Sequence, residues 1–351
     1  MPKDSPKKAD NGLPKPSLEH LKRLTDDTGL FQHARFIIPD RLNGYTTDDN
    51  ARALIVTAKY YKQYADPQAL RLFEIYLAFL CHALKPDGTV HNFMDYNRNW
   101  RTGEIELDTL GRTLWALGSV IASPPSPVYL SIAKEFFSEA TKHIPVLSPR
   151  GMSYAILGLV DYLSQSPDED EIKRHIAQAA EKLTNLHRRF ATKEWDWFEN
   201  ILSYDNAIIP AALFAAGMAL GEKKYLDIAE RACKFLLANT YNGKYFSFIG
   251  SDSWYSKGKE RSKFDQQPIE VAGTVLTLRN AYLATNNQEY LKLERKAFDW
   301  FLGDNDLHLP MYDSQTKGCC DGLGPDNINT NQGAESIVSF LLALLNISEP
   351  V

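Results

Sequence analysis

The feature of this chain that most constrains its fold is a recurring segment in which a short polar motif leads directly into an apolar run of helical periodicity. Each motif suits a helix N-terminus, because Asp, Ser and Asn side chains cap free backbone amides and proline is tolerated in a first helical turn. The runs that follow are small or apolar on nearly all sides, which is typical of buried helices. Six such motifs begin at Thr47, Leu107, Ser148, Tyr204, Gln266 and Asn331.

Amphipathic segments with charged outer faces alternate with these buried runs. They cover residues 66–83, 127–141, 168–190, 223–238 and 287–302, and a further helix is expected at 17–25. The motifs recur at roughly 40 to 65 residues, a spacing typical of helical hairpins. The sequence therefore predicts an all-α (α/α)6 toroid, in which six inner helices are ringed by six outer ones and helix 17–25 lies beside the last inner helix, 332–345.

The alternation is continuous over most of the 351 residues. We therefore predict one toroid domain at 17–351, preceded by a disordered tail or linker at 1–16 that is rich in Lys and Pro. This first segment has no apolar core of the kind found in signal peptides, and the longest apolar stretches are too short to span a bilayer. We expect a cytoplasmic protein that does not interact with membranes.

Composition argues against two classes of partner. The net charge is −5, and no basic stripe interleaves with aromatic residues, so we expect no nucleic-acid partner. The four cysteines include the adjacent pair Cys319 and Cys320, but no Cys-x-x-Cys or His-x-x-His spacing accompanies them. We therefore expect no metal site and no cofactor.

The connections between the expected helices differ in length at the two ends of the toroid. Those from an outer to the next inner helix are mostly long, at 85–106, 142–147, 191–203, 239–265 and 303–330, whereas the opposite turns are short. Long loops in compact domains are usually functional. We expect the long-loop end to carry the site, with small β-hairpins in its loops, one of them at 89–95.

These loops and helix starts are rich in groups that bind sugars. Aromatic faces stack on pyranose rings, while carboxylates, amides and guanidinium groups bond the hydroxyls. The predicted substrate-binding residues are Arg52, His91, Asp108, Arg112, Arg150, Trp197, Tyr204, Asn206, Gln266, Gln267, Asp321, Asn331 and Gln332.

Five carboxyl groups are candidates for catalysis. Glu199, among aromatic residues, and Glu270, one turn inside an apolar helix, are the candidate acids, because burial raises a carboxyl pKa. The candidate bases are Asp49, Asp265 and Glu335. Structural alternatives stay open: Glu270 and Glu335 could pair with buried arginines, and Asp265, Glu199 and Asp321 could be turn residues. We interpret Asp48 as a helix cap.

Several segments together resemble a family of bacterial (α/α)6 domains, six-hairpin glycosidase-like, that are found fused to or encoded beside glycosyltransferases and mannoside phosphorylases. They are 31–34 (FQHA), 44–54 (GYTTDDNARAL), 204–207 (YDNA), 265–270 (DQQPIE), 319–322 (CCDG) and 331–336 (NQGAES). The resemblance spans about residues 30–345 and implies carbohydrate chemistry, with a glycosyltransferase as a possible partner. It supplies no catalytic residues. Where the family has Asp-Ser-His-Gly-Arg, this chain has LDTLGR at 107–112.

Three functional hypotheses follow. The first is a glycoside hydrolase that uses two carboxyl groups on an oligosaccharide, with mannose-containing chains among the candidate substrates. The second is a non-catalytic glycan-binding companion of a glycosyltransferase. The third is a sugar epimerase, which would need histidines on the inner helices, and none of the six helix starts has one.

Overall fold

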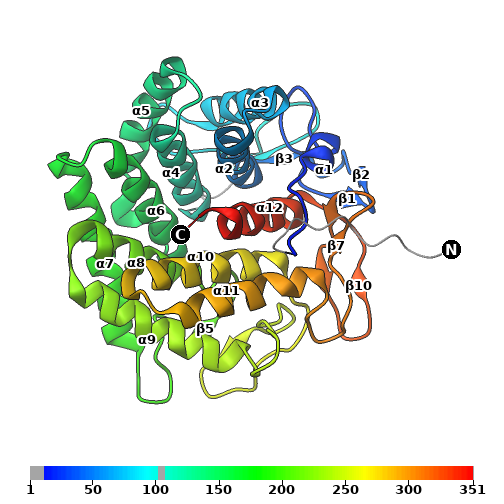
Figure 1. Ribbon diagram of the computed structural model, residues 1–351. Coiled ribbons are helices and arrows are strands. Elements are labelled where there is room, and N and C mark those ends of the chain that lie inside the picture. The colour runs from blue at the N-terminus through cyan, green and yellow to red at the C-terminus, as the bar shows by residue number, and fades with distance from the viewer. Residues whose placement is uncertain (1–11, 102–106, 351) are drawn as a thin grey trace.

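The computed structural model describes residues 12–101 and 107–350, and over these residues the protein is an (α/α)6 toroid, as the sequence predicts. Six inner helices surround the barrel axis in the described part of the chain (Figure 1). They are α2 (Thr47–Tyr64), α4 (Leu107–Ala122), α6 (Pro149–Gln165), α8 (Ile208–Leu220), α10 (Pro268–Thr285) and α12 (Ala334–Ser348). Each contacts the next, and α12 packs against α2, which closes the ring.

Each outer helix packs against the inner ring. The longer ones are α3 (Pro67–Ala83), α5 (Pro127–Thr141), α7 (Asp170–Phe190), α9 (Lys223–Thr240) and α11 (Gln288–Asp299), which contact α2, α4, α6, α8 and α10 in that order. The short α1 (Glu19–Arg23) lies against α12, the predicted place for the N-terminal helix. Two 3₁₀ turns, η1 (Ile144–Val146) and η2 (Trp300–Leu302), follow α5 and α11.

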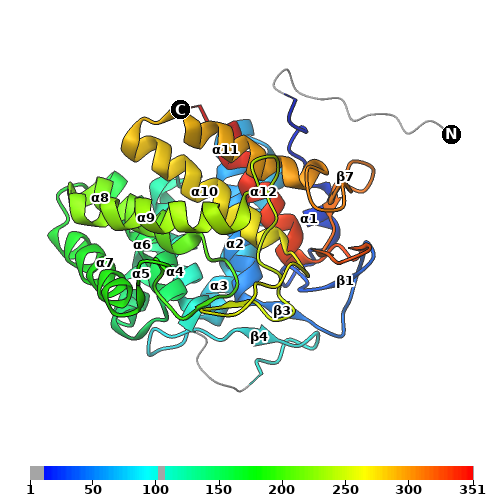
Figure 2. The same cartoon turned by 90° about the horizontal axis from the view of Figure 1, so that it is seen from below.

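All described strands lie in the segment before α2 and in the long loops, so the predicted small β-hairpins are confirmed at this end. Among the described residues the strands form five antiparallel pairs, β1–β2, β3–β4, β5–β6, β7–β8 and β9–β10. Their bounds are β1 (Ala34–Arg35), β2 (Ile38–Pro39), β3 (Tyr45–Thr46), β4 (Phe93–Met94), β5 (Ile201–Leu202), β6 (Tyr255–Ser256), β7 (Tyr312–Asp313), β8 (Gly318–Cys319), β9 (Gly322–Leu323) and β10 (Ile328–Asn329). Figure 2 shows β3 and β4 at the side of the toroid opposite the C-terminus.

Two local predictions differ from the structure. The N-terminal helix is only five residues long, because Thr25 leaves it to form a β-bridge with Leu30. Residues 89–95 do not form a hairpin of their own, since Phe93–Met94 pairs with Tyr45–Thr46 in front of α2. Of the predicted tail, residues 1–11 lie outside the described part, while Leu13 is buried against the domain.

The helix boundaries follow from local chemistry. The Ser148 hydroxyl caps α6 by accepting from the Gly151 amide at 2.9 Å, and the Asp66 carboxylate caps α3 through the Gln68 amide. A proline stands in the first turn of α3, α5, α6 and α10. In α8 every residue from Ile208 to Gly217 is buried, which explains its apolar sequence on all sides.

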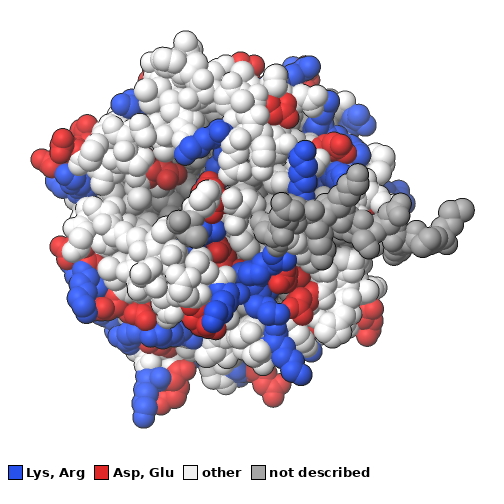
Figure 3. All heavy atoms as spheres, viewed as in Figure 1, with Lys and Arg blue, Asp and Glu red and all other residues white. Residues whose placement is uncertain are grey.

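The outer surface carries charges of both signs. Figure 3 shows Lys and Arg interspersed with Asp and Glu on the face of the toroid turned toward the viewer in Figure 1. Within residues 12–101 and 107–350, no helix combines the length and the apolar character that crossing a bilayer requires.

Glycines set the distance between α4 and α6. A Cβ atom on Gly118 would clash with the carbonyl oxygen of Gly158, and one on Gly111 would clash with that of Gly151. The two backbones therefore touch directly along this part of the inner ring.

We expect Gly118→Ala to lower the free energy of unfolding by about 1–3 kcal/mol, because α4 and α6 must separate to admit the methyl group. The direction of this change is informative, because a glycine-to-alanine substitution in an open helix instead stabilises the helix by roughly 0.5–1 kcal/mol. Urea unfolding measures the difference, and Ser138→Ala, on the exposed face of α5, serves as a near-neutral control. A variant as stable as the wild type would contradict the close packing.

Candidate active site

The long-loop end contains a cleft made of two adjoining cavities. Lobe 1, of about 630 Å³, is lined by α2, α12 and their loops, and lobe 2, of about 560 Å³, lies over the starts of α4 and α6. Asp48, Gln267 and Glu335 line both lobes and mark their junction. Both volumes are in the range of small-ligand sites.

The first turn of α2 carries two carboxyl groups, Asp48 and Asp49, and its N-cap decides what they can bond. Thr46, rather than Asp48, caps this helix: its hydroxyl accepts from the Asp49 amide at 3.1 Å. The interpretation of Asp48 as the cap is therefore wrong. The helix begins at Thr47, so Thr46 occupies the cap position and Asp48 already lies in the first turn. Its carboxylate is left to bond other side chains.

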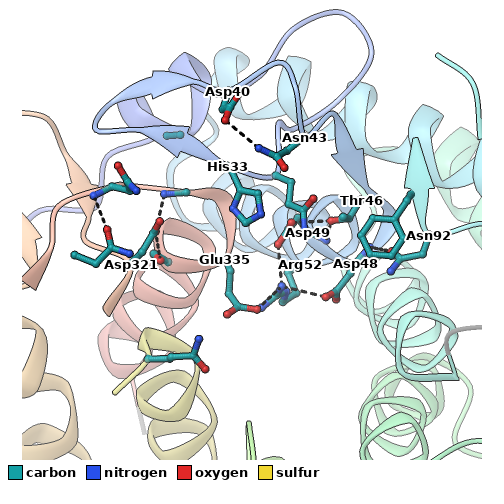
Figure 4. Close-up of a pocket in the computed structure, with 18 of the residues that line it drawn as sticks. His33, Asp40, Asn43, Thr46, Asp48, Asp49, Arg52, Asn92, Asp321 and Glu335 are labelled. Carbon is teal, nitrogen blue, oxygen red and sulfur yellow. Dashed lines mark hydrogen bonds and ion pairs between the residues drawn. The ribbon is translucent and has the colours of Figure 1, made fainter. Parts of the chain in front are cut away.

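Arg52 is the centre of a cluster with three carboxyl groups (Figure 4). Its Nη2 donates to Asp49 at 2.8 Å, to Glu335 at 3.1 Å and to Asp48 at 3.3 Å. Arg52 is almost fully buried, with 4% of its side chain exposed, whereas 41% of the Glu335 side chain is exposed to the cleft. A buried guanidinium thus holds a solvent-accessible carboxylate in a fixed position.

The cluster carries more negative than positive groups. Asp48, Asp49 and Glu335 face Arg52 and the Arg112 guanidinium, which donates to Asp48 at 2.8 Å. Burial raises the pKa of Asp49 to about 7, opposed by Arg52 and assisted by the charges of Asp48 and Glu335. With three carboxyl groups around two guanidinium groups, the cluster favours keeping one proton. Asp49 is the most buried of the three carboxyl groups, so its neutral form is the least unfavourable place for that proton.

A second line of contacts continues below lobe 2. Arg112 donates to the Tyr154 hydroxyl at 2.7 Å, and Tyr154 donates to Asp205 at 2.5 Å. A Cβ atom on Gly273 would clash with the Asp205 carboxylate, so α10 needs a glycine there. These contacts hold Arg112 in the cleft floor from beneath.

A third group lies further round the ring. Arg150 donates to Glu199 at 2.8 Å and to the Asn206 side chain at 3.2 Å, and the Asn206 amide donates to Glu270 at 3.2 Å. Burial, together with the charge of Asp205, raises the pKa of Glu270 to about 8. Arg150 and Glu270 lie beneath the cleft floor and line neither lobe.

Two aspartates form the opposite wall of lobe 1. Asp321 accepts from the Gly333 amide at 2.7 Å and the Ser336 hydroxyl at 2.6 Å, so it caps α12 from outside the helix. Asp265 lies beside it, and burial, with the charges of Asp252 and Asp321, raises its pKa. Among the described residues, Asp265 Oδ1 has no hydrogen-bond partner. Asp265 therefore lines the cavity as a carboxyl group whose pKa is raised, so it holds a proton more readily than an exposed aspartate.

The structure brings most of the predicted residues to the cleft. Lobe 1 is lined by Asp49, Arg52, Asp265, Gln267, Asp321, Asn331 and Glu335, and lobe 2 by Asp108, Arg112 and Tyr204 together with Gln267 and Glu335. Tyr204 and Ser148 both donate to Asp108, so this carboxylate already has partners inside the protein.

Other predicted residues line neither lobe. These are His91, Arg150, Trp197, Glu199, Asn206, Gln266, Glu270 and Gln332. The Trp197 ring is fully buried against Phe198 and Phe235, and Gln266 holds loops together by bonding the Trp300 indole and the Phe248 amide. His91 stacks on Trp100. Aromatic and amide residues in long loops thus also build the loops' own core.

Several cleft residues were absent from the predicted set. They are His33, Asp40, Asn43, Thr46, Asn92 and Ser336. His33 lies between Asp321 and Asp49 in Figure 4. It belongs to the segment 31–34 that resembles the bacterial family, and this resemblance was the sequence feature that could have marked His33 as a cleft residue. Asp40 and Asn43 carried none, because only folding brings their connection, between β2 and β3, to the cleft.

The described residues contain no group of three or more His, Cys, Asp or Glu side chains arranged to hold a metal ion. The groups that line the cleft are carboxyl, guanidinium, amide, hydroxyl and imidazole groups, with a few apolar side chains.

Comparison with known proteins defines the fold class. No family model and no curated protein sequence matches the chain. Solved structures do, including a sugar epimerase from a ruminal bacterium (TM-score 0.72, 11% identity, 94% of this chain and 95% of the other). Cellobiose 2-epimerase from Bacillus thermoamylovorans matches with TM-score 0.72, 12% identity and coverages of 93% and 95%. An α-1,6-mannanase, GH76A of Salegentibacter, matches with TM-score 0.62, 14% identity and coverages of 94% and 96%.

These neighbours are six-hairpin glycosidase-like enzymes, and the chain shares their fold. At such identities the likeness concerns the fold alone. The association with glycosyltransferases stays a prediction.

Glu270→Gln should change how stability depends on pH. The folded-state pKa of Glu270 is about 8, whereas a glutamate in an unfolded chain titrates near about 4.3. Between these values the folded state binds the extra proton, so stability falls as pH rises through this window and the loss is complete above it. The glutamine variant lacks this loss.

We therefore expect Glu270→Gln to have a higher urea midpoint than the wild type at about pH 9, and a smaller difference at about pH 5. Glu135→Gln, on the exposed surface of α5, is the control and should follow the wild type at both pH values. Parallel curves for wild type and Glu270→Gln would show that Glu270 does not retain a proton.

Proposed function

We propose that this protein is a carbohydrate-active enzyme, and specifically a glycoside hydrolase that acts on short oligosaccharides. The observation that carries the proposal is lobe 1, a polar cavity in which Asp265, with a raised pKa, and Glu335, held by Arg52, are both lining residues. A hydrolase of this kind needs one carboxyl group that donates a proton and one that accepts.

We assign the acid to Asp265 and the base to Glu335. Asp265 donates its proton to the glycosidic oxygen as the bond to the anomeric carbon breaks. Glu335 takes a proton from the water whose oxygen forms the new bond. Arg52 orients Glu335. Because burial raises the pKa of Asp49, this carboxyl can exchange a proton when the charge on Glu335 changes, and the cluster keeps its geometry. Glu199 and Glu270, nominated as acids from sequence, line neither lobe.

Mannose-containing oligosaccharides are the first substrates to test. The Salegentibacter mannanase structure holds α-1,6-mannotriose bound to an inactive variant in which two consecutive aspartates are replaced by asparagine. This chain has the consecutive aspartates Asp48 and Asp49 at its cleft. The family that the sequence resembles, associated with mannoside phosphorylases, points to the same sugar.

The amide variants Asp265→Asn and Glu335→Gln should each lower kcat by roughly 10² to 10⁴-fold, because general acid and general base assistance are lost. Asp265→Asn should also remove the alkaline limb of the kcat/KM profile, since a general acid loses activity as pH rises through its pKa. Release of reducing sugar from a panel of manno- and gluco-oligosaccharides measures both effects.

Asp161→Asn is the matched control. Burial raises the pKa of Asp161 to about 6, but this carboxyl lines a cavity at the short-loop end. Undiminished turnover in Asp265→Asn and Glu335→Gln would refute the assignment of roles. Sugar binding without turnover on any substrate would favour the glycan-binding companion of a glycosyltransferase.

Sugar epimerisation is the second candidate, favoured by His33 at the centre of lobe 1. Epimerisation beside a carbonyl exchanges a carbon-bound proton with solvent, whereas hydrolysis does not. Incubating cellobiose, mannobiose and mannose in D₂O and following the C2 proton by NMR therefore separates the two reactions. Deuterium at C2 that disappears in His33→Gln would support the epimerase and contradict the hydrolase.

A further inference from the structure

The two lobes of the cleft differ in what lines them. Lobe 1 is bordered almost entirely by polar side chains, whereas lobe 2 adds the apolar surfaces of Leu107, Ile269, Tyr204 and Trp254. Three residues that line lobe 1 have a buried polar atom that makes no hydrogen bond within the described residues. These atoms are Asp48 Oδ1, Asp265 Oδ1 and Arg52 Nη1. Buried polar groups beside a cavity are suited to the hydroxyls of a bound sugar.

Two segments far apart in the sequence form one wall of lobe 1. The segment before α2 and the loop before α12 are joined by hydrogen bonds: the Phe36 amide donates to the Asn331 side chain at 2.8 Å, and the Gln332 amide donates to the Phe36 carbonyl at 2.9 Å. A third bond runs from the Ala334 amide to the Gln32 carbonyl at 3.0 Å. Gln32 and Asn331 line the lobe, so these bonds join the two segments into one continuous wall of lobe 1.

Trp254 is held rigidly at lobe 2. Its backbone has a left-handed φ of 58°, which is unfavourable for a bulky residue and costs on the order of 1 kcal/mol. Both backbone groups are fixed: its amide donates to the Gly250 carbonyl at 3.1 Å, and its carbonyl accepts from the Ser262 amide at 2.8 Å. The loop therefore keeps a flat aromatic side chain at the cavity at a conformational cost.

We propose that the site recognises the non-reducing end of a sugar chain, with the terminal unit in lobe 1 and the next unit stacked on Trp254 in lobe 2. The anomeric carbon and the glycosidic oxygen between the two units then lie on the lobe 1 side of the junction, in the cavity that Asp265 and Glu335 both line. The joined wall leaves no path for a further unit beyond the one in lobe 1. This inference rests on the proposed carbohydrate function and adds to it the substrate class. The enzyme removes single sugars from chain ends, and Trp254 determines affinity for the second unit.

Trp254→Gly tests the inference without straining the fold, because glycine accepts a positive φ. Calorimetry with mannose, mannobiose and mannotriose should show that the variant binds the disaccharide roughly tenfold more weakly than the wild type, while monosaccharide binding is unchanged. Trp254→Phe, which keeps an aromatic face, should restore most of the affinity. Tyr96→Ala, an exposed aromatic of the same end that lines neither lobe, is the matched control.

End-modified ligands test the closed wall. Mannotriose carrying a bulky group on its non-reducing unit should not bind, whereas the same group at the reducing end should be tolerated. Equal disaccharide affinity in wild type and Trp254→Gly, or binding of the end-blocked chain, would overturn the inference even if the protein hydrolyses glycosides. Weakened disaccharide binding by a protein that never turns over a sugar would uphold the recognition of chain ends and refute the hydrolase.

Discussion

The site depends on one buried guanidinium. Arg52 donates to Asp48, Asp49 and Glu335, so a single positive charge holds carboxyl groups from α2 and α12 together at the floor of the cleft. Removing a buried charge from such a cluster leaves its partners uncompensated, which is far more destabilising than losing a surface pair. The same interaction therefore links the first and last inner helices and sets the position of the candidate base.

The toroid explains why so many polar groups converge. Every inner helix begins at the long-loop end, so the N-terminal turns of α2, α4, α6, α8, α10 and α12 face a common centre. Helix N-termini favour negative groups, and Asp48, Asp49, Asp108, Glu270 and Glu335 lie in such first turns. Burial raises the pKa of Asp49 and of Glu270, and Arg52 and Arg150 respectively oppose that rise. The neighbours of each carboxyl group differ from helix to helix, so the helix starts carry chemically different carboxyl groups.

Some residues predicted for the site have a structural role instead. Trp197 and Gln266 belong to long loops rich in aromatic and amide groups, but these loops need a core and hydrogen bonds of their own, and both residues supply them. Trp254 has the same residue type as Trp197 and comes from an adjacent loop, yet it lines lobe 2. An aromatic residue in a long loop can either line the cleft or pack inside the loop. Only the path of the backbone decides which of these roles it has.

The sequence by itself determined the fold, because six polar motifs followed by apolar helical runs admit few arrangements that bury those runs. It also determined which end carries the cleft, since loop lengths and helix directions are local properties. The tertiary structure decided which side chains share a cavity. His33, Asp40 and Asn43 reach lobe 1 only because their segment is hydrogen-bonded to the loop before α12, nearly 300 residues away. Contacts at such a separation depend on how the ring closes, and no local pattern encodes them.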